Sequence, residues 1–257
     1  MDTQYKKVAV AAALKSGALI KRSVGKIKNI SYKGRINLVT DVDKASEKLI
    51  IRTILKAFPD HSILSEESRP TQGASGYKWV IDPIDGTTNF ARQFPFFCNS
   101  IGLEKDGQLV LGVVYDPMRD ELFCAEKGKG AYLNGKRIHV TAITTMSDAF
   151  LTTGFAYGLN RIKDNVDNFK RFLMRALAVR RPGSAALDFC YVACGRFDGF
   201  WELYLHPWDC AAGVLMVTEA GGKVTKFDGS EYSHYDREVL ASNGAIHKKM
   251  VKVLLTE

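Results

Sequence analysis

Two stretches near the N-terminus place apolar residues at helical spacing. Residues 3–22 carry small and apolar residues in this pattern, and Gly25 follows as a terminator. Between Asp43 and Phe58 the apolar positions recur at i, i+3, i+4 and i+7, and Pro59 prevents a further helical turn. The chain is therefore expected to begin with two helices.

A strand pattern follows these helices. "SILSEE" (62–67) predicts a short strand that ends in acids, and "YKWVID" (77–82) predicts a second strand. Residues 97–126 contain three apolar runs rich in β-branched and aromatic residues, and Asp106-Gly107 joins the first two as a hairpin turn. Asn134-Gly135 indicates another hairpin. The first 140 or so residues thus predict helices followed by a largely antiparallel sheet.

Beyond "TAITTMSD" the pattern alternates between strand and helix. "AFLTTG", "AVRRP" and "DGFWEL" predict strands, while "SAALDFCYVACG" and the glycine-terminated "WDCAAGVLMVTEAGG" predict helices. A further helix is expected to carry Val166, Phe169, Leu173 and Ala176. With no linker or internal repeat, we expect an α/β second part packed on an α+β first part, with functional sites at strand ends.

Composition narrows the class of protein. A chain of 257 residues, with 46% hydrophobic and 25% charged residues, predicts one large domain or two closely packed ones. The net charge of +8 favours acidic partners such as phosphorylated metabolites, nucleic acid or an anionic surface. Five cysteines without a C-x-x-C pair indicate neither a disulfide framework nor a zinc site, and they predict a cytoplasmic protein. "VAVAAAL" is too short to span a bilayer, so no membrane partner is expected.

Acidic residues recur where predicted strands end or helices begin. They are Asp41, Asp43, Glu66, Glu67, Asp82, Asp85 and Asp209. Any one of them alone is typical of a helix cap or a turn. Two carboxylates about 4 Å apart, however, repel by roughly 4 kcal/mol at an effective dielectric of about 20. Either a shared proton or a divalent cation must relieve that repulsion, and an all-oxygen ligand set without histidine or cysteine favours magnesium.

The segment after these aspartates suggests a phosphate site. If Gly86-Thr87-Thr88 opens a helix, its free N–H groups form an anion site beside the cation. No P-loop motif is present. "IDGT" also resembles part of the D-x-D-G-T motif of haloacid-dehalogenase-type phosphatases, but Pro83 stands where those enzymes have their nucleophile. These observations predict phosphoryl chemistry in which water attacks.

Five separated motifs together resemble the inositol monophosphatase family of magnesium-dependent, lithium-sensitive sugar phosphatases. They are "LVTDVD" (38–43), "SEES" (65–68), "WVIDPIDGTTNF" (79–90), "RRPGSAALD" (180–188) and "PWDCAAG" (207–213). The resemblance implies a layered αβαβα sandwich of the sugar phosphatase type. It also implies an N-terminal α+β subdomain (1–142) with most metal ligands, and a C-terminal α/β subdomain (143–257) with Asp209 and the substrate contacts.

The same resemblance assigns roles to individual residues. Glu66, Asp82 and the carbonyl of Ile84 would hold one Mg²⁺, while Asp82, Asp85 and Asp209 would hold a second. Glu66 would reach a third ion through water, which gives two or three ions per site. Thr87 and Asp43 would orient and deprotonate the attacking water, although Asp43 alone is also compatible with a helix cap. The implied substrate contacts are Asp85, Gly86, Thr87, Arg180, Gly183, Ser184, Ala185, Glu202 and Asp209. Arg180 is equally compatible with a purely structural role.

The resemblance implies a phosphomonoesterase that hydrolyses myo-inositol 1-phosphate and forms a homodimer. Fructose 1,6-bisphosphate ranks second among the candidate substrates, followed by histidinol phosphate and NADP. A protein of another class, which binds nucleic acid or a transcription complex, is the distant alternative. It rests on the basic stretch 15–29, which lacks the interleaved aromatic residues of a stacking surface.

Overall fold

The computed structural model describes residues 3–27, 29–32, 38–156 and 159–256. Within these residues the chain forms seven helices, two mixed sheets and a short two-stranded ladder. The helices are α1 (Thr3–Ser23), α2 (Asp41–Ala57), α3 (Thr87–Ala91), α4 (Leu159–Leu173), α5 (Ala185–Ala193), α6 (Pro207–Glu219) and α7 (His247–Leu254). The ladder pairs β1 (Ile30–Tyr32) with β2 (Leu38–Thr40).

The larger sheet has seven strands, which follow the order of the sequence. They are β3 (Ser62–Ser65), β4 (Tyr77–Asp85), β5 (Cys98–Lys105), β6 (Gln108–Asp116), β7 (Glu121–Glu126), β8 (Gly130–Leu133) and β9 (Lys136–Ile138). β3 and β4 pair in parallel, and all later neighbours pair antiparallel. The parallel pair carries its acidic residues at the same end of the sheet.

The smaller sheet has five strands in the order β11-β10-β12-β14-β13. They are β10 (Phe150–Thr153), β11 (Ala178–Arg180), β12 (Gly199–Leu203), β13 (Lys223–Thr225) and β14 (Glu238–Ser242). β10 pairs in parallel with both β11 and β12, while β14 pairs antiparallel with β12 and β13.

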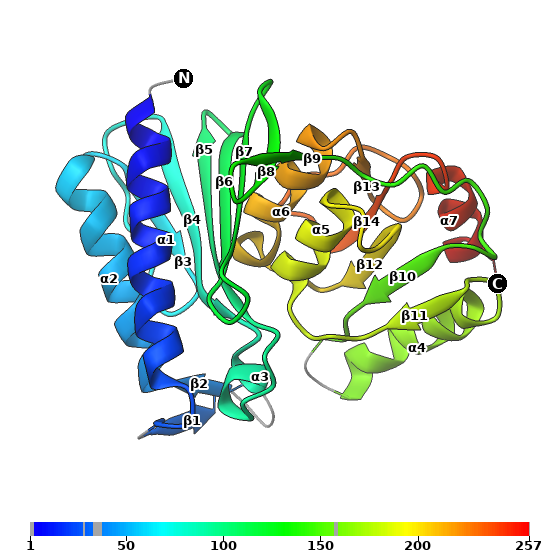
Figure 1. Cartoon of the computed structure of the whole chain (residues 1–257), viewed down its shortest axis with the longest axis horizontal. Coiled ribbons are helices and arrows are strands. Elements are labelled where there is room, and N and C mark those ends of the chain that lie inside the picture. The colour runs from blue at the N-terminus through cyan, green and yellow to red at the C-terminus, as the bar shows by residue number, and fades with distance from the viewer. Residues whose placement is uncertain (1–2, 28, 33–37, 157–158, 257) are drawn as a thin grey trace.

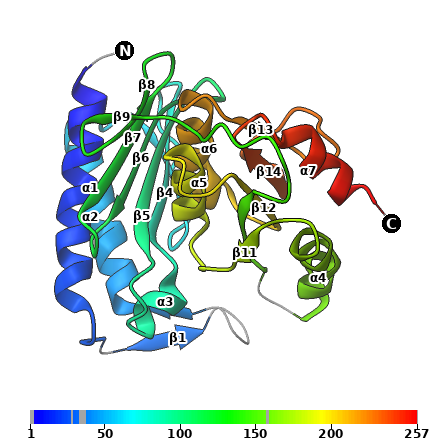
Figure 2. The same cartoon turned by 45° about the vertical axis from the view of Figure 1, so that its right-hand side comes forward.

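Helices and sheets alternate in five layers (Figure 1). α1 and α2 cover one face of the seven-stranded sheet, α5 and α6 lie between the two sheets, and α4 and α7 cover the outer face of the five-stranded sheet. The turned view in Figure 2 shows the same order, with α3 and β1 together at one end. One buried apolar cluster includes Phe123 of the larger sheet, Phe189 of α5 and Phe200 of the smaller sheet. A continuous core therefore joins the two halves.

The layered fold predicted from the sequence is confirmed, and so are both hairpins. The helix expected to include Ala176 ends at Leu173 instead, and α2 begins two residues before Asp43. The sequence patterns did not reveal β1, β2, β13, β14 or α7, all of which are short. The boundary proposed at residue 142 stays a prediction; the seven-stranded sheet ends at Ile138 and the five-stranded sheet begins at Phe150.

Two facing glycines let α6 approach the larger sheet closely. Gly102 of β5 and Gly112 of β6 are direct cross-strand partners. A Cβ added at Gly102 would lie 2.8 Å from the Ala211 Cβ, and one added at Gly112 would lie 2.7 Å from the Ala212 carbonyl oxygen. Side chains at these positions would therefore push away the first turns of α6, which carry Asp209.

We expect Gly112→Ala to lower the free energy of unfolding by about 1–3 kcal/mol, because the extra methyl group overpacks a backbone contact that cannot rotate away. Urea unfolding of the two proteins measures the difference. Gln108→Ala, at an exposed position of the same strand, is the control and is expected to cost less than about 0.5 kcal/mol. Equal stability of Gly112→Ala and the wild type would contradict the close packing.

No helix in the described ranges is both long and apolar enough to cross a bilayer.

Candidate active site

The C-terminal end of β4 carries the first two aspartates on an irregular turn of backbone. The pairing of β4 with β5 slips between Asp82 and Asp85, where Pro83 lacks the N–H of a regular strand. Asp82 is only 2% exposed, and its Oδ1 accepts the backbone N–H of Ile84 at 2.9 Å. The bulge thus presents both carboxylates at one end of the sheet.

Asp85 connects the two halves of the protein. Its Oδ2 accepts a hydrogen bond from the Ser184 hydroxyl at 2.6 Å and another from the Ala186 N–H at 2.7 Å. Ser184 is the N-cap of α5, so a carboxylate from β4 satisfies the free N–H groups at the start of that helix. This contact fixes the N-terminal end of α5 against the end of β4.

Asp209 occupies the third position of α6, which begins at Pro207. Its Oδ2 accepts the backbone N–H of His206 at 2.7 Å, as in a helix-capping interaction. The capping role therefore occupies one carboxylate oxygen. A cation needs only the other oxygen, so the structural and the ligand roles are compatible.

Asp82, Asp85 and Asp209 converge on one point. One carboxylate oxygen from each lies within 4.8 Å of the others. Burial raises the pKa of Asp85 to about 6, despite the hydrogen bonds from Ser184 and Ala186. Burial also raises the pKa of Asp82 and Asp209 well above their ordinary range, and repulsion from the neighbouring carboxylates adds to the rise. Three oxygen ligands that lie close together and repel one another fit a hard divalent cation such as Mg²⁺.

The other two predicted ligands lie next to this triplet. Glu66 follows β3, its backbone N–H donates to the Ile81 carbonyl at 3.2 Å, and its charge contributes to the raised pKa of Asp82. It is not one of the three carboxylates whose oxygens lie within 4.8 Å of one another. The Ile84 carbonyl accepts the Thr87 hydroxyl at 2.9 Å.

Thr87 and Asp43 are in direct contact. The Thr87 hydroxyl lies 2.9 Å from Asp43 Oδ1 as well as 2.9 Å from the Ile84 carbonyl. One hydroxyl proton serves only one of these acceptors at a time. Asp43 is fully buried, which raises its pKa, while hydrogen bonds from Thr40 and Thr87 act in the opposite direction. Asp43 also completes the capping box of α2 with Thr40, so the predicted cap and the predicted contact with Thr87 are both present.

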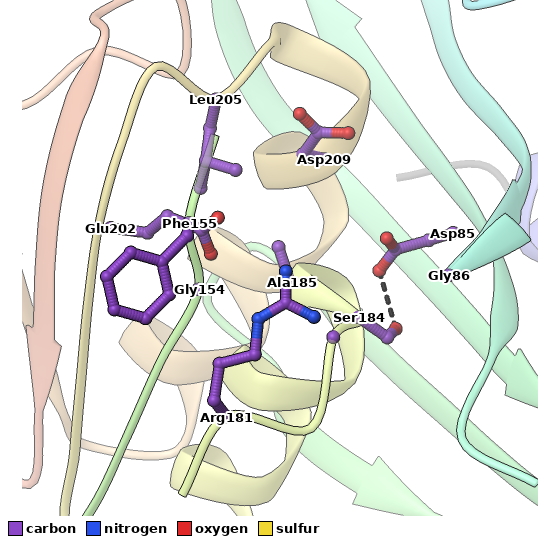
Figure 3. Close-up of a pocket in the computed structure, with 11 residues that line it drawn as sticks. Asp85, Gly86, Gly154, Phe155, Arg181, Ser184, Ala185, Glu202, Leu205 and Asp209 are labelled. Carbon is purple, nitrogen blue, oxygen red and sulfur yellow. Dashed lines mark hydrogen bonds between the residues drawn. The ribbon is translucent and has the colours of Figure 1, made fainter. Parts of the chain in front are cut away.

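A pocket opens beside the aspartates (Figure 3). Seven of the predicted substrate contacts line it, namely Asp85, Gly86, Gly183, Ser184, Ala185, Glu202 and Asp209. Gly86 has φ +91° and caps the five-residue helix α3; a Cβ there would lie 3.0 Å from the Phe96 carbonyl oxygen. The position therefore requires glycine.

Sequence reasoning missed four residues that line the pocket: Gly154, Phe155, Arg181 and Leu205. Arg180, which was predicted to contact substrate, does not line it. Its guanidinium lies over the Phe150 ring, 4.9 Å from the centroid, whereas Arg181 projects into the pocket (Figure 3). Successive residues point to opposite sides of an extended chain, and β11 ends at Arg180. The motif "RR" contained the correct residue type, but only the alternation of side chains along the strand decides whether Arg180 or Arg181 enters the pocket.

Glu202 forms the wall opposite the aspartates. It is 7% exposed and comes from β12. Burial raises its pKa to about 8, although the positive charge of Arg181 lowers it. A Cβ on Gly154 would lie 2.1 Å from a Glu202 carboxylate oxygen, so Gly154 leaves the space that this carboxyl occupies. The pocket therefore places the Glu202 carboxyl, which is able to form hydrogen bonds, and the Arg181 guanidinium next to the apolar side chains of Phe155 and Leu205.

The raised pKa values predict how magnesium stabilises the protein. In the folded protein the pKa of Asp85 is about 6, above its ordinary value of 3.8. Protonated Asp85 therefore makes its full contribution to the stability of the metal-free fold below about pH 4, and this contribution is lost as the pH rises through 6. At higher pH the ionised carboxylates repel, and a bound cation relieves the repulsion. We expect magnesium chloride to raise the melting temperature more at about pH 8 than at about pH 5. Sodium chloride of equal ionic strength is the control in thermal unfolding, and equal shifts at both pH values would contradict the assignment.

Comparison with known proteins assigns this geometry to a family. Residues 1–256 match the inositol monophosphatase family. The chain belongs to that family. A relative named inositol-1-monophosphatase, from Synechocystis sp., is 43% identical over 252 residues and covers 96% of this chain and 87% of its own length. The relative named Nus factor SuhB, from Escherichia coli strain K12, is 44% identical over 248 residues, with coverage of 95% and 93%.

Solved structures of inositol monophosphatases share the fold. The enzyme from Anabaena (Nostoc) sp. superposes with a TM-score of 0.90 at 42% identity, covering 98% of this chain and 95% of its own. A structure described as IMPase/NADP phosphatase complexed with Mg²⁺ and phosphate has a TM-score of 0.86 at 26% identity, with coverage of 99% and 96%. The family is metal-dependent, and the protein described here is a phosphatase of the inositol monophosphatase family.

Proposed function

We propose that the protein is a magnesium-dependent phosphomonoesterase that hydrolyses inositol monophosphate, such as myo-inositol 1-phosphate, to inositol and phosphate. The observation that carries this proposal is the convergence of Asp82, Asp85 and Asp209 beside a pocket lined by Glu202 and by the backbone of Gly86. Carboxylates for a cation and hydrogen-bonding groups for a polyol thus meet at one place. The family match supports the same reading.

The cluster of Asp82, Asp85 and Asp209 fits a magnesium ion, and we propose two or three ions per site. Glu66, Asp82 and the Ile84 carbonyl would hold one, Asp82, Asp85 and Asp209 a second, and Glu66 a third through water. When bound, magnesium would supply positive charge that activates water and stabilises the departing oxygen. All other steps fall to groups of the chain itself.

Thr87 and Asp43 would direct the attacking water. If the Ile84 carbonyl binds a cation, it no longer accepts the Thr87 hydroxyl. The Thr87 hydroxyl would then donate its hydrogen bond to Asp43 Oδ1, which is 2.9 Å away. The Thr87 oxygen then acts as an acceptor toward a water molecule. Asp43, buried with a raised pKa, is able to take up the proton that the water loses. The N–H groups of Gly86 and Thr87, at the start of α3, would bind the phosphate oxygens.

Phosphate release from a panel of substrates tests the proposal. We expect magnesium-dependent turnover of myo-inositol 1-phosphate to exceed that of fructose 1,6-bisphosphate, histidinol phosphate and NADP. Each substrate is assayed with and without lithium, because lithium sensitivity is predicted. Turnover of none of these compounds in the presence of magnesium would contradict the proposal.

Fructose 1,6-bisphosphate is the second candidate substrate, and Arg181 is the observation that favours it. A guanidinium in the pocket, next to Ser184 and Glu202, would bind a second phosphate group better than a hydroxyl. Under this alternative, Arg181→Ala raises KM for the bisphosphate at least tenfold and leaves KM for inositol 1-phosphate nearly unchanged. A similar KM change for both substrates would assign Arg181 to polyol binding instead.

A function of another class rests on the relatives named Nus factor SuhB and on the net charge of +8. Under it, the protein would bind a nucleic acid or a transcription complex. Affinity for RNA that falls steeply with salt, together with no magnesium-dependent turnover, would favour this function over the phosphatase. A homodimer and a cytoplasmic location stay predictions that rest on the family resemblance and composition; light scattering tests the first.

A further inference from the structure

The inward face of α2 changes character along its length. In its C-terminal half this face carries the fully buried Ile50 and Ile54, whereas in its N-terminal half it carries Asp43, Ser46 and Glu47. These three are buried too, with exposures of 0%, 0% and 6%, against 0% for both isoleucines. All five positions share one face of the helix at helical spacing. The polar half of the face therefore lies inside the protein, against the ends of β3 and β4.

Glu47 holds the backbone on both sides of Glu66. Its Oε2 accepts the hydroxyl of Ser65, and the same oxygen accepts the backbone N–H of Glu67 at 2.9 Å. The Glu66 N–H itself donates to Ile81 of β4. The predicted ligand is thus fixed from the preceding residue, the following residue and the neighbouring strand.

Stability alone does not account for Glu47. A buried carboxylate costs several kcal/mol unless it is compensated, and an apolar side chain of similar volume is often at least as stable. Among the described residues Glu47 forms no ion pair, and two hydrogen bonds from the segment around Glu66 are its compensation. The free-energy cost of burying Glu47 therefore falls at a position where its carboxylate immobilises the predicted ligand Glu66.

Ser46 holds the other strand end in the same way. Its hydroxyl donates to the Pro83 carbonyl at 2.9 Å, inside the bulge between Asp82 and Asp85. Since that proton is used, the 2.6 Å contact with the Ser16 hydroxyl must be donated by Ser16. Asn99 in turn donates to Ser16 at 3.3 Å. A directional chain of hydrogen bonds therefore runs from β5 through α1 and α2 to the bulge.

We propose that Ser46 and Glu47 are positioning residues, and that α2 fixes the ends of β3 and β4 relative to each other before the cation binds. Glu47 sets Glu66, and Ser46 sets the bulge that carries Asp82 and Ile84. Asp43, one turn earlier on the same face, contacts Thr87. One rigid helix thus aligns the ligands with the residue that directs water. The inference rests on the proposed magnesium site and adds the source of its geometry.

Magnesium binding to the whole protein, measured by calorimetry, tests this inference through two variants at position 47. Glu47→Met keeps the approximate volume but removes the acceptor, and we expect it to weaken magnesium binding about 10–100-fold. Glu47→Gln keeps a carbonyl oxygen that is able to accept both hydrogen bonds. We expect it to stay within about threefold of the wild type, because positioning depends on the acceptor and not on the charge.

Glu219→Met is the matched control. Glu219 also accepts two backbone N–H groups, from Gly128 at 2.7 Å and Gly130 at 2.8 Å, but it lies at the opposite end of α6 from Asp209. We expect this variant to lose stability while binding magnesium like the wild type. Thermal unfolding of each metal-free variant separates a loss of stability from a loss of positioning.

Two outcomes overturn the inference. Wild-type affinity in Glu47→Met would show that the hydrogen bonds do not set the site, and equal losses in Glu47→Met and Glu47→Gln would show that only the charge matters. If Glu47→Met does not fold, Ser65→Ala removes one of the same bonds from the strand side, and an affinity unchanged from the wild type overturns the inference equally. A wild-type protein that binds no magnesium contradicts the proposed function itself, so the two failures are distinguishable.

Discussion

Asp82→Asn is expected to reduce magnesium-dependent phosphate release by at least about 10³-fold, because several kcal/mol of charge stabilisation is lost with the ligand. The substitution keeps the shape of the side chain and an oxygen able to accept the Ile84 N–H. It also removes a buried charge that neighbouring carboxylates repel. The metal-free variant is therefore expected to unfold at the same temperature as the wild type or at a higher one.

Two measurements on purified Asp82→Asn check this prediction, namely phosphate release with saturating magnesium and thermal unfolding in a chelator. Asp120→Asn is the control, since Asp120 is exposed and its carboxylate accepts a hydrogen bond from the Tyr115 hydroxyl, outside the cluster of Asp82, Asp85 and Asp209. Full activity in Asp82→Asn would remove Asp82 from the metal site. A folded but inactive variant that still binds magnesium like the wild type would contradict the assigned ligand role.

Thr87→Val is expected to lower kcat by about 10²–10⁴-fold, the range of a general acid–base contribution, with little change in magnesium affinity. Valine matches the shape of threonine but removes the hydroxyl that joins Asp43 to the site. Thr87→Ser keeps that hydroxyl, so it should retain most of the activity. Single-turnover kinetics and magnesium titration of both variants check the prediction. A rate near that of the wild type in Thr87→Val would exclude threonine from the mechanism.

Local sequence signals were sufficient for most of the larger sheet. Turns such as Asp106-Gly107 and Asn134-Gly135 fix antiparallel neighbours through local backbone geometry, so the strand order follows the chain. The C-terminal strands β13 and β14 gave no comparable signal. They are three and five residues long; β14 owes its place to pairing with β12, and β13 owes its place to pairing with β14. Such short strands depend on tertiary contacts more than on their own pattern.

Glu47 and Arg181 show the same limit within the site. In the sequence, Glu47 is an ordinary helix residue, and nothing local indicates that its carboxylate is buried against Ser65. Arg181 and Arg180 are adjacent and chemically identical, so no spacing rule chooses between them. Burial and strand register assign these roles, and both arise only when distant segments pack.

The sequence by itself determined which chemical groups were available: an all-oxygen set of acids at strand and helix ends, a glycine-threonine segment beside them, and the motif order of the family. Only the tertiary structure decided which of these groups meet. Asp209 joins Asp82 and Asp85 because facing glycines admit α6 to the sheet, and because Asp85 caps α5 from the other half of the chain. Residue types follow from local chemistry, whereas distances between carboxylates follow from packing across the whole core.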